Sequence, residues 1–301
     1  MQQQTTPHAP ARKPEVHPRI TRFAFAPSDY FTIRGQRLAW SELVDPRLFD
    51  AGHRLGLRQR LLGATPFEYL AVDDWFNPDL LKLVREEFDL YPFEDGRDLD
   101  RKYENTYRSP RYPVLGPAGQ VYFGLVNAGW FVELLTEITQ VEELIADPTL
   151  HNGGLHESRR GGKFSIHRDF ERSECSGLSN EMVLITYLNE HWNPAWNGAL
   201  ELWDSSRAQC VRRIEPELGR SVLMRNGPAS YHGHSAELLI PDGQARRSLA
   251  SYYYTHSAAS KADRRSSASR YLFVEPFDRL KWFARQVTPP VIWGALKRVL
   301  R

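Results

Sequence analysis

A short histidine-arginine-aspartate segment holds the residue types in this chain that could do chemistry. His167 and Asp169 lie two residues apart, and His232 follows in a distant Tyr-His-Gly-His segment. Two imidazoles and one carboxylate can hold one face of an Fe(II) ion and leave the opposite face open to O2 and a cosubstrate. Arg247 follows and would supply a fixed cation for a dicarboxylate such as 2-oxoglutarate. These four residues predict a non-haem iron site beside a dicarboxylate pocket.

Strand geometry would bring these side chains together. Residues 164–170 are predicted as a strand, on which side chains two apart share a face, so His167 and Asp169 would point at one ion. A second strand is predicted over 247–255. Its odd-numbered positions share one face, and they are Arg247, Leu249, Ser251 and Tyr253. If this face turned inward, it would place the guanidinium, a small hydroxyl and an aromatic ring inside a barrel near the metal.

Several further motifs accompany the histidines in a fixed order. They are Gly153-Gly154-Leu155-His156, Gly161-Gly162 before His167-x-Asp169-Phe170, Tyr187-Leu188-Asn189, Asn197-Gly198-Ala199-Leu200-Glu201-Leu202-Trp203-Asp204, Tyr231-His232-Gly233-His234, and Arg246-Arg247-Ser248-Leu249-Ala250-Ser251-Tyr252-Tyr253-Tyr254-Thr255. With them, the stretch from about Gly153 to Thr255 resembles the prolyl 4-hydroxylase-like 2-oxoglutarate/Fe(II) dioxygenases, especially bacterial members. The resemblance implies a mainly β fold with supporting helices, a double-stranded β-helix (jelly roll).

The resemblance carries over to individual positions. The implied iron ligands and catalytic residues are His167, Asp169 and His232. The implied cosubstrate-binding residues are Arg247, Tyr187, Ile185 and Ser251, with Arg247 gripping the distal carboxylate of 2-oxoglutarate. Two alternatives stay open: His234 could replace His232 as the third ligand, and Arg246 could replace Arg247 as the anchor.

The activity that the resemblance implies is hydroxylation of a C–H bond. The cofactors would be Fe(II), 2-oxoglutarate and O2, with ascorbate as an optional addition, and the products would include succinate and CO2. The expected substrate is a prolyl residue of a peptide or protein, or a small amino-acid or sugar-derived metabolite. The alternative is a non-catalytic jelly-roll protein that binds ligands or senses 2-oxoglutarate or oxygen. Turnover of 2-oxoglutarate to succinate separates the two.

Composition narrows the remaining possibilities. The chain has 301 residues, 41% of them hydrophobic, and a net charge of +2, so overall charge favours no nucleic-acid partner. Two cysteines, Cys175 and Cys210, provide no disulfide framework. No apolar run is long enough to predict a transmembrane segment, and no secretory signal is visible. We therefore expect a cytoplasmic protein, with an oligomeric state that composition does not specify.

Four segments are expected along the chain. Residues 1–20 are predicted as a disordered tail, and 21–148 as a support region of strands and helices belonging to the same domain as the core. Residues 149–256 would form the jelly-roll core. Residues 257–301 would form a loop and amphipathic helices, interrupted by two prolines and packed on the domain or touching a membrane.

Local patterns predict elements within the support region. A strand is predicted over 66–75, followed by a helix with Asn77 as its N-cap and Pro78 at its first position. Residues 91–120 are predicted as a long loop beside the substrate cleft, and 127–146 as a single helix.

Overall fold

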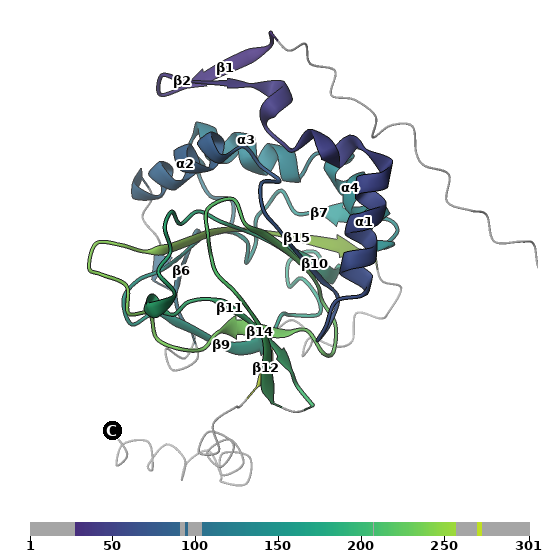
Figure 1. Cartoon of the computed structure of the whole chain (residues 1–301), viewed down its shortest axis with the longest axis vertical. Helices are drawn as coiled ribbons and strands as arrows, with labels where there is room; N and C mark the ends of the chain where they lie inside the picture. The colour runs from purple at the N-terminus through teal and green to yellow at the C-terminus, as the bar shows by residue number, and fades with distance from the viewer. Residues whose placement is uncertain (1–27, 91–93, 96–103, 207, 257–269, 273–301) are drawn as a thin grey trace, which may run out of the picture.

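The computed structural model shows two facing β-sheets with helices packed on one side (Figure 1). It describes residues 28–90, 94–95, 104–206, 208–256 and 270–272. The predicted tail over 1–20 and the amphipathic helices within 257–301 lie outside the described residues.

The strands form two large antiparallel sheets. In spatial order, the eight-stranded major sheet contains β3 (Tyr69–Val72), β13 (Ser221–Arg225), β10 (Ser179–Tyr187), β15 (Arg246–Thr255), β8 (Gly154–Ser158), β6 (Tyr107–Arg108) and β4 (Glu94–Asp95), and β7 (Ile145–Ala146) pairs with β15. The six-stranded minor sheet contains β12 (Gln209–Ile214), β11 (Leu200–Asp204), β14 (Tyr231–His234), β9 (Lys163–Arg168) and β16 (Arg270–Tyr271), and β5 (Glu104–Asn105) pairs with β9.

The connections between these sheets define a double-stranded β-helix. Strands β8, β15, β10 and β13 are neighbours in the major sheet, and β9, β14, β11 and β12 are neighbours in the minor sheet. From β8 to β15 the chain passes repeatedly between the two sheets, except at β11 and β12, which pair with each other in the minor sheet. The two ends of this series, β8 and β15, lie side by side. The predicted mainly β jelly roll is confirmed.

The central strands are buried on both faces, because helices cover one face and the opposite sheet covers the other. On β15, Leu249 and Tyr253 pack with the helical layer, whereas Ala250 and Tyr252 belong to the cluster between the sheets. On β10, Leu184 faces the helices and Val183 faces the minor sheet. Both faces of these strands therefore require apolar side chains.

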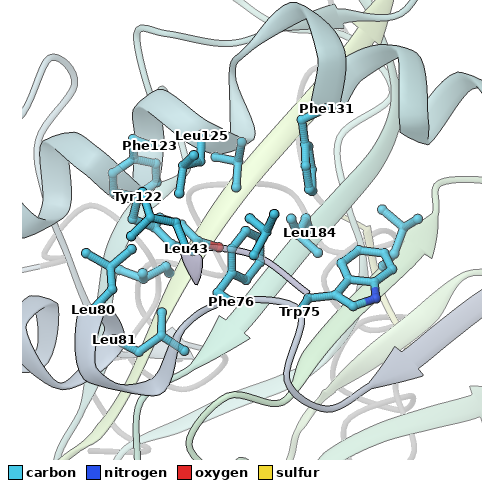
Figure 2. Close-up of a cluster of buried hydrophobic side chains, with 14 of the residues drawn as sticks. Leu43, Trp75, Phe76, Leu80, Leu81, Tyr122, Phe123, Leu125, Phe131 and Leu184 are labelled. Carbon is cyan, nitrogen blue, oxygen red and sulfur yellow. The ribbon is translucent and has the colours of Figure 1, made fainter. Parts of the chain in front are cut away.

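Four helices pack on the outer face of the major sheet (Figure 1). They are α1 (Ala51–Leu62), α2 (Pro78–Glu87), α3 (Pro117–Val126) and α4 (Gly129–Thr139). Figure 2 shows Phe76, Tyr122 and Phe131 gathered with Leu184 of β10 in the apolar cluster of this layer. The side chain of Asn77 accepts from the backbone amides of Asp79 and Leu80, so the predicted start of α2 is confirmed.

Short elements complete the described chain. A hairpin of β1 (Tyr30–Ile33) and β2 (Gln36–Ala39) precedes α1, and 3-10 helices cover Trp40–Glu42, Pro46–Phe49, Phe88–Leu90 and Pro194–Trp196. No single helix within the described ranges is long and apolar enough to cross a membrane. Helices α3 and α4, which meet at a bend of 46°, are together long and apolar enough for a broken span, by length and composition only.

Several predicted boundaries are wrong. The helix predicted over 127–146 ends at Thr139, where Gln140 takes a left-handed conformation with φ 58°. The segment predicted as a loop over 91–120 contains the start of α3. The buried carboxylate of Glu87 accepts the amides of Ala118 and Gly119 there, a tertiary cap that no local pattern reveals.

Candidate active site

Three candidate metal ligands meet between the sheets. In the register of β9 with β14, His167 lies directly opposite His232, and Asp169 follows just beyond the end of β9. The predicted strand over 164–170 is thus shorter, yet the three side chains still converge. Nε2 of His167 is 3.4 Å from Oδ1 of Asp169, and Nε2 of His232 is 3.9 Å from Oδ2. One ligand atom from each residue lies within 4.8 Å of the others, and all three residues are buried.

Backbone carbonyls fix the protonation of both imidazoles. Nδ1 of His167 is 2.9 Å from the carbonyl oxygen of Ser165, and Nδ1 of His232 is 3.0 Å from that of Ser230. A carbonyl only accepts, so each Nδ1 carries the proton and each Nε2 presents a lone pair toward the centre. Two neutral imidazoles and one carboxylate are the donor set that suits a divalent non-haem iron, and the residues fit this ion.

Burial and neighbouring charges favour the metal-binding protonation states. Burial would raise the pKa of Asp169, but the adjacent His232 and His167 outweigh it and hold this pKa below its usual value. Burial lowers the pKa of His232, although Asp169 opposes the shift. Near neutral pH the site therefore presents an ionised carboxylate and an uncharged imidazole.

A bulge separates His232 from His234. The β14–β9 register shifts between them, so His234 pairs with Phe164 instead of with Ser165, which an unshifted antiparallel register would place opposite it. His234 also faces the cavity, but its Nδ1 has no hydrogen-bond partner and it lies outside the ligand cluster found among the described residues. Of the two alternatives, the geometry therefore favours His232.

The ligands line a cavity of about 410 Å³ between the sheets. Its major-sheet wall follows the even-numbered residues of β15, including Arg246, Ser248, Ala250 and Tyr252. From β10, it includes Ile185 and Tyr187.

Arg246 lies at this wall and carries a buried charge. It is 7% exposed, and its Nε donates to the carbonyl oxygen of Gly198 at 2.7 Å. Its Nη2 donates to the hydroxyl of Tyr187 at 3.3 Å. Among the described residues, no Asp or Glu forms an ion pair with it. A buried guanidinium normally pairs with an anion, so this end of the cavity is suited to a ligand carboxylate.

The predicted inward direction of Arg247 is wrong. Its guanidinium points to the outer side of the major sheet, where Nε donates to Glu157 at 2.9 Å and Nη2 to Asp89 at 2.6 Å. Its Nη1 donates to the backbone carbonyl of Arg85 in α2. Arg247 therefore ties the helical layer to β8, and the odd-numbered face of β15 packs against helices because Leu249 and Tyr253 are buried there.

The other predicted cosubstrate residues divide between the two faces. Tyr187 and Ile185 line the cavity as expected. Ser251 shares the outward face of Arg247, is not among the cavity residues, and its hydroxyl has no hydrogen-bond partner within the described chain. The placement predicted for Ser251 is therefore also wrong.

Further polar residues line the same cavity without having been assigned a role from sequence. They are Glu104, Thr106, Arg108, His151, Asn152, His156, Ser158 and Glu174. Burial, followed by the nearby Arg108, lowers the pKa of His156 to about 4. Glu104, Thr106 and Arg108 lie two residues apart, which is the spacing of one face of a strand. The sequence could not have predicted this strand, because the segment is too short and too polar to distinguish from a loop.

The fold and the clustered side chains define a jelly-roll protein with a candidate non-haem iron site. Residues 153–254 match the model of the 2OG-Fe(II) oxygenase superfamily. This segment, which holds all three candidate ligands, belongs to that superfamily, and the chain is an oxygenase that depends on Fe(II), 2-oxoglutarate and O2. The family resemblance indicated by the sequence motifs is therefore confirmed as membership of the 2OG-Fe(II) oxygenases. No curated protein sequence matches the chain.

Solved structures with a similar arrangement are distant in sequence. A Pseudomonas putida prolyl-4-hydroxylase aligns with TM-score 0.48 and 15% identity over 68% of this chain and 100% of that one. A Trichoplax adhaerens prolyl hydroxylase in complex with a hypoxia inducible factor peptide aligns with TM-score 0.47 and 14% identity over 67% and 91%. HygX from Streptomyces hygroscopicus, with nickel, 2-oxoglutarate and hygromycin B bound, aligns with TM-score 0.45 and 13% identity over 68% and 92%.

Proposed function

We propose that His167, Asp169 and His232 hold Fe(II), that Arg246 and Tyr187 hold the distal carboxylate of 2-oxoglutarate, and that the chain hydroxylates a C–H bond of a small-molecule or peptide substrate. The observation that carries this assignment is the buried guanidinium of Arg246, which no carboxylate of the described residues pairs with, in the same cavity as two imidazoles and a carboxylate. When bound, Fe(II), 2-oxoglutarate and O2 supply an oxidation that releases succinate and CO2 and converts C–H into C–OH.

The residues of the chain orient and desolvate these groups. The carbonyls of Ser165 and Ser230 hold both imidazole rings with Nε2 toward the ion. The apolar side chains of Ile185, Val183 and Leu200 line part of the cavity and reduce its polarity. In this surrounding, the guanidinium of Arg246 interacts strongly with an anion because solvent does not screen the charge.

The segmental organisation and location also remain proposals. We propose residues 149–256 as the oxygenase core, 21–148 as its supporting region, and 257–301 as a C-terminal extension. A cytoplasmic location is supported by two free cysteines, Cys175 and Cys210, which suit a reducing compartment.

The test is succinate formation from 2-oxoglutarate by the full chain with Fe(II) under air. We expect slow substrate-free turnover in the wild type and none with His167→Ala or Asp169→Ala. The matched control is His191→Asn. His191 is exposed and lies outside the cavity, and asparagine tolerates the left-handed backbone conformation at this position. Unchanged turnover in either ligand variant, with the fold intact by circular dichroism, would contradict the assignment.

A further inference from the structure

Residues 104–108 cross from the minor sheet to the major sheet along one side of the cavity. Glu104 belongs to β5, which pairs with β9 of the minor sheet, and Arg108 belongs to β6, which pairs with β8 of the major sheet. Glu104, Thr106 and Arg108 all line the cavity. The alternate residues turn elsewhere, because Asn105 donates to the carbonyl of Gly161 and Tyr107 stacks under the guanidinium of Arg159.

Arg108 lies at the opposite side of the cavity from the proposed 2-oxoglutarate anchor. The strand register aligns a row of cavity residues across the major sheet, in the order Arg108, His156, Ser248 and Tyr187. Three strand spacings of about 4.8 Å place the backbones of Arg108 and Tyr187, at the two ends of this row, roughly 14 Å apart. A five-carbon dicarboxylate spans roughly 6 Å, from C–C bonds of about 1.5 Å. One 2-oxoglutarate held at Tyr187 therefore leaves Arg108 available to a second ligand.

The charges on this segment are incompletely paired. The side chain of Arg108 is 26% exposed, and its one ionic partner within the described ranges is Oε1 of Glu104 at 3.5 Å. Glu104 is 5% exposed, and Thr106 donates to the same Oε1 at 2.8 Å. Most of the five guanidinium N–H donors and Oε2 of the carboxylate are thus left for a ligand. At 3.5 Å the Arg108–Glu104 contact is longer than the 2.7–2.9 Å of a well-formed charge-assisted hydrogen bond.

We infer that the substrate is a free α-amino acid, with its carboxylate on Arg108 and its ammonium group on Glu104. This inference rests on the proposed function and names the substrate class of the same site. An α-amino acid carries its two charges on one carbon, so it matches a cation and an anion that lie side by side on the wall. A residue inside a peptide has neither charge.

The size of the cavity agrees with a small substrate. Its volume of about 410 Å³ lies near the lower end of the roughly 300–1,000 Å³ common for small-molecule sites. The same space must also hold 2-oxoglutarate, which leaves room for a compact molecule beside it.

The first experiment compares free and capped amino acids on the Fe(II)-loaded full chain. Succinate formation from 2-oxoglutarate is measured with each of the common L-amino acids, and then with the N-acetyl and C-amide forms of any that accelerate it. We expect at least one free amino acid to raise the rate about tenfold or more above substrate-free turnover. We expect either cap to lower kcat/KM about 100-fold, because each cap removes one charged contact.

Variants of the wall test the same contacts from the protein side. Arg108→Ala should raise the apparent KM for the free amino acid about 100-fold. Glu104→Gln should raise the apparent KM mainly for ligands whose amine is free, and much less for their N-acetyl forms. Arg212→Ala is the matched control, since Arg212 is exposed on β12 and outside the cavity, and it should leave the KM unchanged. The capped ligands test the contacts even if a wall variant fails to fold.

The outcomes separate this inference from the proposed function. If the wild type turns over 2-oxoglutarate but no free amino acid accelerates it, or if capped forms work equally well, the inference is overturned and the oxygenase assignment stands. If the wild type neither turns over 2-oxoglutarate nor binds it anaerobically with Fe(II), the proposed function fails, and the inference fails with it.

Discussion

Replacing Arg246 or Arg247 by alanine separates cosubstrate binding from stability within one dipeptide. The two side chains leave β15 on opposite faces. Arg246 faces the cavity beside Tyr187, whereas Arg247 binds Glu157 and Asp89 on the helical side. Because they share strand, residue type and neighbours in sequence, each variant controls for the other.

The magnitudes follow from burial. Arg246 is 7% exposed, and removing one partner of a buried charge pair costs roughly 2–5 kcal/mol. A loss of about 3 kcal/mol corresponds to a rise of about 100-fold in the Kd or KM for 2-oxoglutarate. Arg247→Ala instead leaves Glu157, 2% exposed, with Arg159 at 2.6 Å as its remaining partner. We expect a stability loss of about 1–3 kcal/mol, and a Tm lower by about 2–4 °C for each kcal/mol.

The assays are anaerobic calorimetric titration of the Fe(II)-loaded chain with 2-oxoglutarate and thermal unfolding of each variant. Arg246→Lys is a useful intermediate, since it keeps the charge but loses the planar two-pronged donor. If Arg247→Ala weakened 2-oxoglutarate binding about 100-fold while Arg246→Ala bound it normally, the assignment of faces and the role of Arg246 would both be refuted.

Three further predictions concern the metal ligands and the cavity wall. Asp169→Ala should reduce Fe(II) binding in anaerobic equilibrium dialysis at least about tenfold while leaving the circular dichroism spectrum unchanged, because the carboxylate supplies the charged ligand; retained binding would contradict its role. Gly233→Ala should weaken Fe(II) binding about 10–100-fold, since its Cβ would lie 2.6 Å from the carbonyl oxygen of Phe164 and force apart the strands that carry the histidines; an unchanged affinity would show that the bulge is tolerant. The pKa of His156 is lowered to about 4 by burial and the nearby Arg108, so between pH 6.5 and 4 the unfolded chain binds more protons than the folded chain. The free energy of unfolding therefore falls as pH falls, by at most about 3 kcal/mol. In urea titrations across this range His156→Asn should flatten the dependence, and an unchanged slope in this variant would refute the shift.

Much of the fold and the metal site could be predicted because their signals are local. The strand predicted over 247–255 and the helix predicted after the cap at Asn77 lie close to β15 and α2 as observed. The Gly-x4-His-x-Asp segment and the later His-Gly pair hold the candidate ligands, and His167 and Asp169 converge as expected although β9 ends at Arg168. The start of α3 could not be predicted, because the carboxylate that caps it belongs to Glu87 in another helix.

By itself, the sequence determined the chemistry available: the kinds of ligand, their order along the chain, and two adjacent arginines of which one had to face inward. Tertiary structure alone decided which arginine that is. Every position of β15 from Ser248 to Tyr254 is buried, since helices cover one face and the second sheet the other, so the strand has no polar face to mark the outside. Tertiary structure also brought Glu104 and Arg108 into the cavity, because Glu104 pairs with Phe164 of β9 and Arg108 with His156 of β8, both far along the chain.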